Sequence, residues 1–91
     1  MREITLNGKY MTSIPSLHKY LQAELILPEG RGQNLDDLWD CLMTIDFPTH
    51  IALVRASAML DEIYEYGEEL VQLFYDICIA NKNITFSMSQ E

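Results

Sequence analysis

The sequence predicts a two-layer α/β protein, with a three-stranded parallel sheet packed against about four helices. Three segments have the composition of strands (EITLNG, THIALV and NITFSMS), and segments with helical periodicity separate them. Parallel strands require long crossover connections, which helices usually supply. Because such crossovers are right-handed, we expect the helices largely on one side of the sheet, in a strand order that the pattern leaves open. A chain of 91 residues, 48% of them hydrophobic, can bury one modest core, so residues 1–91 are predicted to form a single domain.

The first strand and the first helix are both marked by local signals. Ile4 and Leu6 alternate with polar neighbours in the strand, and an Asn-Gly turn signal follows them. Ser13 is a favourable N-cap residue for the helix, and Pro15 lies in its first turn. A loop with one proline and two glycines ends this helix. The apolar face of the helix consists of leucines that recur every four residues, Leu17, Leu21 and Leu25.

The remaining elements follow from a second cap and two apolar patterns. Asn34 is a good N-cap for a second helix that runs to about Ile45. The nearly continuous apolar run THIALV is typical of a strand that is covered on both faces. A short helical stretch begins at Ser57 and is expected to break at Gly67. Residues 68–80 then form the clearest helix, whose apolar face contains Leu70, Leu73, Phe74 and Ile77.

The charge of the chain restricts the classes of partner. A formal net charge of −8 disfavours nucleic acids and anionic membranes, and it favours cationic partners. Acidity that only maintains solubility would give the same charge, so charge does not separate these functions. No apolar run approaches the roughly 18 residues of a membrane span, and residues 1–10 do not resemble a secretion signal. We therefore expect a cytoplasmic protein in which Cys41 and Cys78 are buried, reduced thiols.

The second helix is expected to have two different faces. Its core face contains aliphatic residues at i, i+3, i+7 and i+10, which are Leu35, Leu38, Leu42 and Ile45. A neighbouring face combines two carboxylates with two apolar side chains, those of Asp36, Trp39, Asp40 and Met43. The helix dipole favours acidic residues in the first turn, but Asp40 lies beyond that turn. Asp40 also has no cationic neighbour one turn away. Tryptophan is enriched at the energetic centres of interfaces, and unpaired carboxylates attract cationic groups. We interpret this face as a binding surface; a core position for Trp39 is the competing interpretation.

Clustered carboxylates also suggest a metal site or an enzyme. The DDLWD segment fits the Asp-Asp-x-x-Asp pattern that holds magnesium in prenyl-diphosphate enzymes. Such chemistry needs a second acidic cluster, cationic residues for the diphosphate and a long helical cavity, which this chain lacks. His18 and His50 have no cysteine or acid at catalytic spacing, and no nucleophile or phosphate-loop motif is present. The sequence therefore predicts no active site, no metal and no cofactor.

The segment ELILPEGRGQNLDDLWDCL, residues 24–42, resembles the signature region of the barstar family. These proteins are intracellular inhibitors of secreted, barnase-type bacterial ribonucleases. The Leu-Asp-x-Leu-Trp-Asp-Cys-Leu core is the specific part of the match, and weaker similarity extends over nearly the whole chain, in EITLNG, SIPSLHKYLQAEL, LVQLFYDI and NITF. The resemblance implies a barstar-like fold with a three-stranded parallel sheet and a protein that is not an enzyme.

The resemblance also implies a binding site on the second helix and the loop before it. Asp40 falls on the carboxylate that enters the phosphate-binding site of the nuclease among basic groups. Met43 replaces a small polar contact residue, and Asp76 replaces a contacting glutamate with a shorter acid. The implied partner is a basic ribonuclease, extracellular or delivered as a toxin, bound one-to-one by a monomeric inhibitor. The partner-binding residues implied in this way are Gly32, Asn34, Leu35, Asp36, Trp39, Asp40, Met43 and Asp76.

Departures from the family pattern point to a nuclease other than barnase. The family has bulky aromatic residues where this chain has Gly30 and Arg31, and the segment MTIDFP is one residue shorter. Arg31 would be unfavourable against a basic cleft unless it points away or meets an acidic patch. We therefore expect weak or no inhibition of barnase itself.

Three functional hypotheses remain open at this point. The first is a ribonuclease inhibitor that acts as an immunity protein or antitoxin. The second is a binding module of the same fold with a non-nuclease partner. The third is a small enzyme or metal protein that uses Asp36, Asp37 and Asp40. One structural detail is also open, because the Phe47-Pro48 peptide bond is a candidate for the cis isomer.

Overall fold

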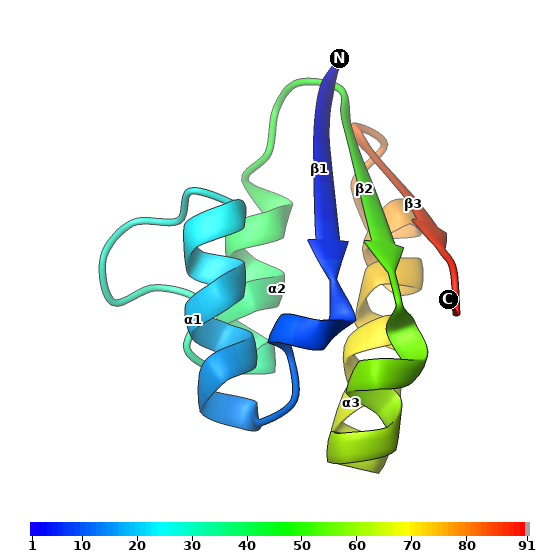
Figure 1. Ribbon diagram of the computed structural model, residues 1–91. Coiled ribbons are helices and arrows are strands. Elements are labelled where there is room, and N and C mark those ends of the chain that lie inside the picture. The colour runs from blue at the N-terminus through cyan, green and yellow to red at the C-terminus, as the bar shows by residue number, and fades with distance from the viewer. Residues whose placement is uncertain (91) are drawn as a thin grey trace.

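The computed structural model describes residues 1–90, so Glu91, the end of the predicted domain, lies outside the described residues. Three strands form one parallel sheet in the order β1-β2-β3 (Figure 1). This confirms the predicted α/β class and its sheet. Residues 1–90 contain three α-helices, where about four were expected. The elements in chain order are β1 (Arg2–Asn7), the short 3-10 helix η1 (Gly8–Tyr10), α1 (Ile14–Glu24), α2 (Leu35–Met43), β2 (Thr49–Val54), α3 (Ala56–Ala80) and β3 (Ile84–Met88).

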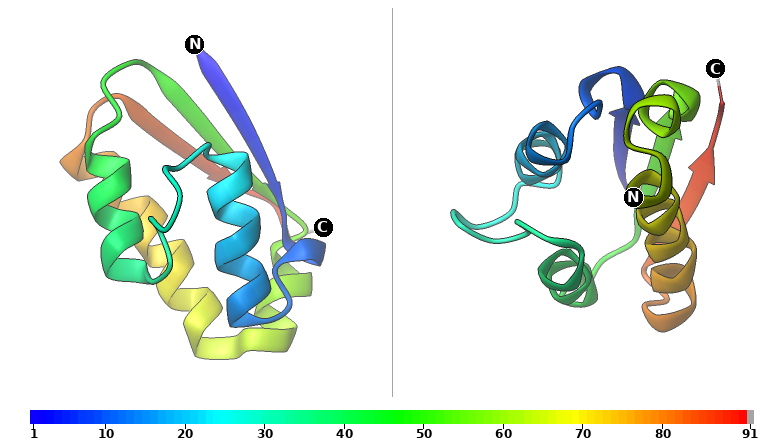
Figure 2. Two further views of the ribbon diagram at one scale, coloured as in Figure 1. Left: turned by 90° about the vertical axis from the view of Figure 1, so that its left-hand side faces the viewer. Right: turned by 90° about the horizontal axis from the view of Figure 1, so that it is seen from below.

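The helices cover one face of the sheet and leave the other face open (Figure 2). The expectation of one-sided crossovers is thus confirmed, but the prediction that the central strand is covered on both faces is wrong. Residues of β2 alternate between buried and half-buried positions, because only every second side chain faces the helices. On the open face, the ring nitrogens of His50 lie 2.7 Å from the Thr85 hydroxyl and 3.1 Å from the Ser87 hydroxyl.

Helix α1 begins and packs as its local signals predict. The Ser13 hydroxyl accepts a hydrogen bond from the Ser16 backbone N–H at 3.3 Å, and Ser16 bonds back to Ser13. Its three leucines are all buried in the core, together with Leu6 of β1. The fully buried centre of the molecule also includes Leu38, Leu42, Ile51, Leu53, Met59, Leu70, Phe74 and Ile77.

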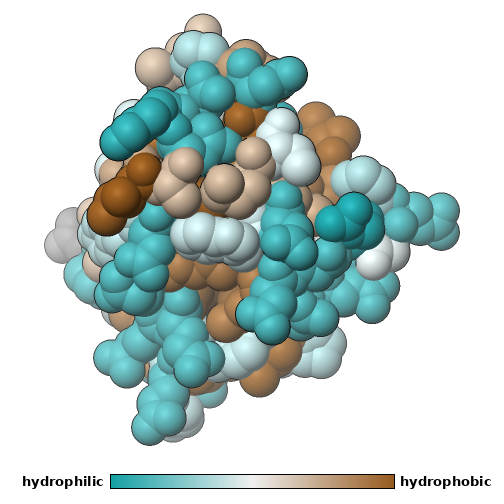
Figure 3. Space-filling model, turned by 180° about the vertical axis from the view of Figure 1, so that it is seen from behind, coloured by the Kyte–Doolittle hydropathy of each residue, from teal (hydrophilic) through white to brown (hydrophobic). Residues whose placement is uncertain are grey.

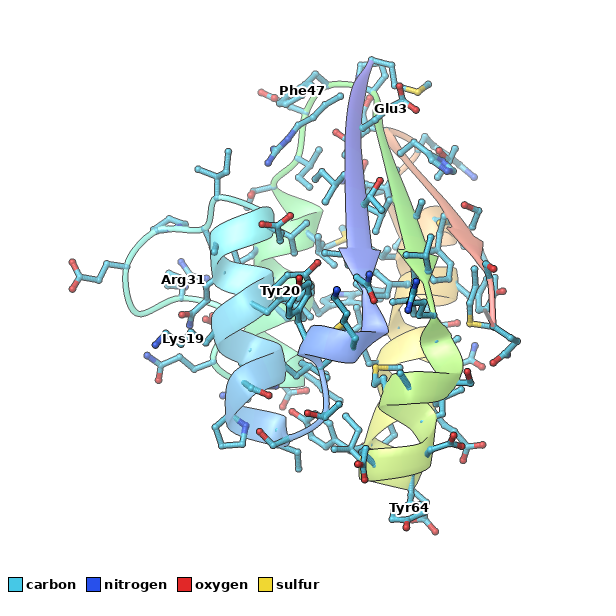
Figure 4. All side chains as sticks on the ribbon, viewed as in Figure 1. Glu3, Lys19, Tyr20, Arg31, Phe47 and Tyr64 are labelled. Carbon is cyan, nitrogen blue, oxygen red and sulfur yellow. The ribbon has the colours of Figure 1, made fainter. Side chains whose placement is uncertain are left out.

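Helix α3 contains the break that the sequence placed at Gly67, but the break lies at Tyr64. Tyr64 has φ 47° and ψ −118°, so two helical segments meet there within one element, and its side chain projects outward at this junction, at the bottom of Figure 4. Gly67 is instead buried and helical: a methyl group there would lie 3.0 Å from Leu60 Cδ2 and 3.3 Å from Met59 Cε. The glycine therefore makes room for close packing of the first segment. Within residues 1–90, no helix combines the length and apolar character needed to cross a membrane.

The loop into β2 differs from one expectation. Residues 1–90 contain no cis peptide bond, so the Phe47-Pro48 bond is trans and the cis prediction is wrong. The Phe47 carbonyl accepts a hydrogen bond from the Thr49 hydroxyl at 3.0 Å, and the Pro48 carbonyl accepts one from the Arg2 N–H. The hydrogen bond from Arg2 to Pro48 therefore pairs the chain with β1 immediately before β2 begins.

Candidate functional site

Helix α2 is fixed at both of its ends. At its start, the Asn34 side chain accepts a hydrogen bond from the Asp37 backbone N–H at 2.8 Å, as the predicted N-cap requires. At its end, the buried Asn81 side chain donates to the carbonyls of Leu42 and Ile45, each at 3.0 Å. The Leu42 carbonyl also accepts a longer bond from the Ile45 N–H, at 3.3 Å, so Asn81 strengthens the C-terminal cap of α2 from the end of α3. Side chains on α2 are thus presented from a rigid support.

The core face of α2 is confirmed at its centre. Leu38 and Leu42 are fully buried, whereas Leu35 and Ile45 at the ends of the stripe are half-buried. Cys41 is also buried on this side. Burying these side chains, at about 25 cal/mol per Å² of apolar surface, holds the helix against the core and decides which face remains outside.

The predicted binding face lies at the surface. Asp36, Asp40 and Met43 are exposed, and Trp39 is half-buried with part of its ring packed against the core. Trp39 therefore lies partly in the core and partly at the surface, between the two positions that were considered for it. Within residues 1–90, the carboxylate of Asp40 forms no ion pair and accepts no hydrogen bond. A carboxylate in that state is free to accept hydrogen bonds from another molecule.

A groove of about 280 Å³ runs between α2 and α3 and brings half of the predicted residues together. From α2 it is lined by Leu35, Asp36 and Trp39, and from α3 it is lined by Asp76, which is distant in sequence. Its floor is apolar and its rim is acidic. Asn34, Gly32, Asp40 and Met43 do not line this groove: they lie along α2 and the loop before it.

Three residues of α3 that the sequence reasoning missed also line the groove, Glu69, Gln72 and Leu73. With Asp76 they recur at i, i+3, i+4 and i+7, so their spacing on one helical face was a usable signal. Gln72 Nε2 donates a hydrogen bond to Asp76 Oδ1 at 2.9 Å, which orients that carboxylate. Seen from behind, the face that carries α3 has apolar side chains near its centre and hydrophilic ones around them (Figure 3).

Gly32 is buried, and its backbone is used inside the protein. Its φ of +77° is a left-handed conformation that favours glycine. Its N–H donates to the Asp37 carboxylate, and its carbonyl accepts a hydrogen bond from His18 Nδ1 at 2.9 Å. The structure therefore gives Gly32 a role in shaping the loop before α2, and it does not bring this residue to the exposed face.

The histidine that holds Gly32 is a buried residue of α1, and its side chain contacts both the loop before α2 and helix α3. Because Nδ1 of His18 donates to the Gly32 carbonyl, Nε2 is the acceptor for the hydroxyl of Tyr66. Burial lowers the pKa of His18 from its ordinary value of 6.5, and the bond to Gly32 acts in the opposite direction. Burial also raises the pKa of Tyr66. The neutral histidine thus ties the loop to the long helix, a structural role that spacing alone did not reveal.

Arg31 forms an ion pair with an acidic group of its own chain, so its charge is not left unpaired beside the exposed face of α2. Its Nη2 lies 2.9 Å and its Nε 3.1 Å from Asp37 Oδ1. This guanidinium, with the Gly32 N–H, holds the pKa of the Asp37 carboxyl below its usual range, and Asp37 raises the pKa of Arg31. Asp37 is therefore internally neutralised, and Asp36 and Asp40 are the carboxylates of α2 that form no ion pair within residues 1–90.

The acidic residues do not form a metal-binding constellation. Within residues 1–90, no three side chains of histidine, cysteine, aspartate or glutamate are grouped so that they could hold a metal ion. Cys41 is buried and Cys78 half-buried; both are free thiols, and burial raises the pKa of each. The exposed face of α2 thus combines exposed acids with a partly buried tryptophan.

Comparison with known proteins agrees with this description. The family model described as "Barstar (barnase inhibitor)" matches residues 1–90. The chain is also 30% identical over 77 residues to the "Putative ribonuclease inhibitor YrdF" of Bacillus subtilis (strain 168), an alignment that covers 84% of this chain and 85% of that protein. The chain therefore belongs to the barstar family.

Proposed function

We propose that this protein is a cytoplasmic inhibitor of a basic ribonuclease, and that it binds the enzyme one-to-one with the exposed face of α2 over the active site. Membership of the barstar family, whose members are inhibitors and not enzymes, supports this role. The observation that carries the proposal is the state of Asp40. It is exposed and internally unpaired, on a helix that Asn34 and Asn81 fix at both ends.

The proposed mechanism is substitution of a carboxylate for an RNA phosphate. A ribonuclease stabilises the charge of its transition state with cationic groups, so its empty cleft is strongly positive. Asp40 would accept charge-assisted hydrogen bonds from those groups. A carboxylate has no phosphodiester bond to cleave, so the inhibitor occupies the site without reacting. Because the helix is already rigid, little conformational freedom is lost when the complex forms.

The groove between α2 and α3 would supply the contacts around this centre. Trp39 offers an apolar surface, and Asp36 and Asp76 place two further carboxylates at its rim. A net charge of −8 would accelerate the encounter with a basic enzyme, and desolvated ion pairs near the centre would slow dissociation. A role in immunity follows from the same binding: the inhibitor would protect the cytoplasm that holds it from a secreted or delivered ribonuclease toxin.

A titration with purified basic ribonucleases tests the proposal. RNA cleavage by the target enzyme should stop when the protein reaches a one-to-one ratio, and barnase should be inhibited weakly or not at all. Subnanomolar inhibition of barnase would contradict the second expectation. Binding to a non-nuclease protein, with no inhibition of any ribonuclease, would favour the alternative of a binding module.

The variant Asp40→Ala tests whether the ribonuclease contacts the exposed face of α2. It should weaken binding by at least about 2 kcal/mol, roughly 30-fold, mainly through faster dissociation and with the fold intact. Asp61→Ala is a matched control, because Asp61 is also an exposed aspartate but lies on the first segment of α3, outside the groove. Equal affinities of the two variants would show that the binding face has been assigned wrongly.

A further inference from the structure

A second hollow, of about 250 Å³, lies on the other flank of α2. Here α2 contributes its Cys41 side, and the remaining walls come from the end of α1, the loop that follows it and the loop into β2. Two of the large hydrophobic side chains that line it are exposed: Ile26 is 78% exposed and Phe47 is 45% exposed. Phe47 and Arg31, which both line the hollow, are labelled in Figure 4.

The backbone at Ile26 is strained. Helix α1 ends with a pair of hydrogen bonds, from the Ile26 N–H to the Ala23 carbonyl at 3.3 Å and from the Leu27 N–H to the Gln22 carbonyl at 3.0 Å. In this type of helix end, the residue after the C-cap adopts the left-handed conformation and is usually glycine. Ile26 occupies that position with φ 54°, which is unfavourable for a β-branched residue.

Folding alone therefore favours glycine at residue 26. The isoleucine side chain strains the backbone and, at 78% exposure, buries little apolar surface in return. Strained residues that a fold retains often lie where the protein binds another molecule. Both unfavourable features of Ile26 would be offset in a complex, where a partner covers the side chain.

The border of the hollow has the opposite charge to the α2 face. Arg2 and Arg31 both line it, in a chain with only six lysines and arginines, and Asp46 is the acidic residue among its walls. Within residues 1–90, Arg31 is paired with Asp37, whereas Arg2 forms no ion pair and its guanidinium donates to the Leu25 carbonyl at 3.1 Å. The chemistry that fits is an apolar side chain with a carboxylate beside it.

Resting on the ribonuclease-inhibitor function proposed above, we propose that this hollow is a second docking point for the ribonuclease. Ile26 and Phe47 cover an apolar side chain from the rim of the enzyme's cleft, and Arg2 faces a carboxylate next to it. The acidic face of α2 is complementary to the basic cleft of a ribonuclease in general. The hollow is complementary to a feature of the rim, and so it selects among such enzymes.

The experiment uses the basic ribonuclease from the titration that the full chain inhibits. Thermal unfolding of the free protein and dissociation constants at 50 and 500 mM salt are measured for wild type, Ile26→Gly, Ile26→Asn and Ile26→Val. Because glycine and asparagine tolerate positive φ, these two variants should raise Tm, by about 2–5 °C for glycine. Both should weaken binding at least tenfold at either salt concentration, since an apolar contact is not screened. Ile26→Val should resemble wild type in both measurements. Arg2→Gln should weaken binding a few-fold at low salt and less at high salt.

The outcomes separate this proposal from the proposed function. Binding by the glycine and asparagine variants within twofold of wild type, while Asp40→Ala weakens it, would overturn the second docking point and leave the inhibitor function standing. Weaker binding with glycine but not with asparagine would also overturn it, because loop flexibility and not contact would explain the loss. If the wild-type chain inhibits no ribonuclease, both proposals fail.

Discussion

The guanidinium of Arg31 holds the carboxylate of Asp37 through two nitrogen atoms, with Nη2 2.9 Å and Nε 3.1 Å from Oδ1. This pair joins the loop before α2 to the first turn of the helix. It also lowers the net negative charge at the surface of α2, because Asp37 is neutralised while Asp36 and Asp40 are not. The consequence is an acidic face of two carboxylates with a cationic side chain at its edge.

The first prediction concerns acid unfolding. The pKa of Asp37 is held below its ordinary value of 3.8, chiefly by Arg31, so the ionised form stabilises the fold. That contribution is present above pH 3.8 and is lost as the pH falls through the lowered pKa. Asp37→Asn should therefore have a lower Tm at neutral pH and a smaller decline of Tm between about pH 4 and pH 2. Asp61→Asn, which lacks such a partner, should keep the wild-type decline; parallel curves for Asp37→Asn would contradict the prediction.

A second pH effect is expected from His18. Its pKa is lowered by burial, so the folded protein binds fewer protons than the unfolded chain just below the ordinary value of 6.5. Stability should therefore be fully present above pH 6.5 and decrease as the pH falls toward 5. His18→Gln should be less stable at pH 8 but should lose less stability over this range. His50→Gln should retain the wild-type slope because His18 is still present. Urea unfolding at several pH values measures both variants.

The cap at the end of α2 can be tested through stability. Asn81→Ala removes two hydrogen bonds and leaves the Leu42 and Ile45 carbonyls with one longer bond each, at 3.3 Å, so the free energy of unfolding should fall by about 1–3 kcal/mol. Asn83→Ala is the matched control, because Asn83 donates to Ile45 alone, at 3.3 Å, and should have a smaller effect. An equal loss for the two variants would show that Asn81 is not a special support of α2.

Gln72 is predicted to act through Asp76. Removing its amide in Gln72→Ala frees the Asp76 carboxylate to rotate, and affinity for the ribonuclease should fall a few-fold. In a double-mutant cycle, Gln72→Ala should have little further effect once Asp76 has been replaced by alanine. Additive losses would mean that Gln72 contacts the partner directly and does not position Asp76.

The parts of the fold that sequence predicted correctly depend on neighbouring residues. Ser13 and Asn34 cap helices within three residues of themselves, and the α1 leucines follow one period. The break in α3 was predicted three residues late, because glycine is a sign of both helix ends and close packing. Gly67 serves close packing, because the Leu60 side chain lies against it, and that contact depends on the tertiary fold.

The same division applies to the site. The exposure of Asp36 and Asp40 follows from the period of α2 alone. The cap at the end of α2 could not be predicted in this way, because Asn81 lies 39 residues from Leu42 along the chain. The ion pair of Arg31 with Asp37 was not predicted either, because it joins a loop residue to a helix residue six positions later.

The last prediction concerns the rate of association. If the acidic face steers the protein to a basic ribonuclease, the association rate should fall at least about tenfold between 50 and 500 mM salt, while dissociation changes less. Asp36→Asn should slow association at low salt, because Asp36 lies beside the groove. Glu3→Gln removes the same charge from an exposed residue of β1, away from that groove, and should slow association less. Stopped-flow mixing with the ribonuclease measures the association rates of the wild type and both variants. A flat salt response would contradict electrostatic steering, and equal effects of the two variants would show that net charge acts without regard to the α2 face.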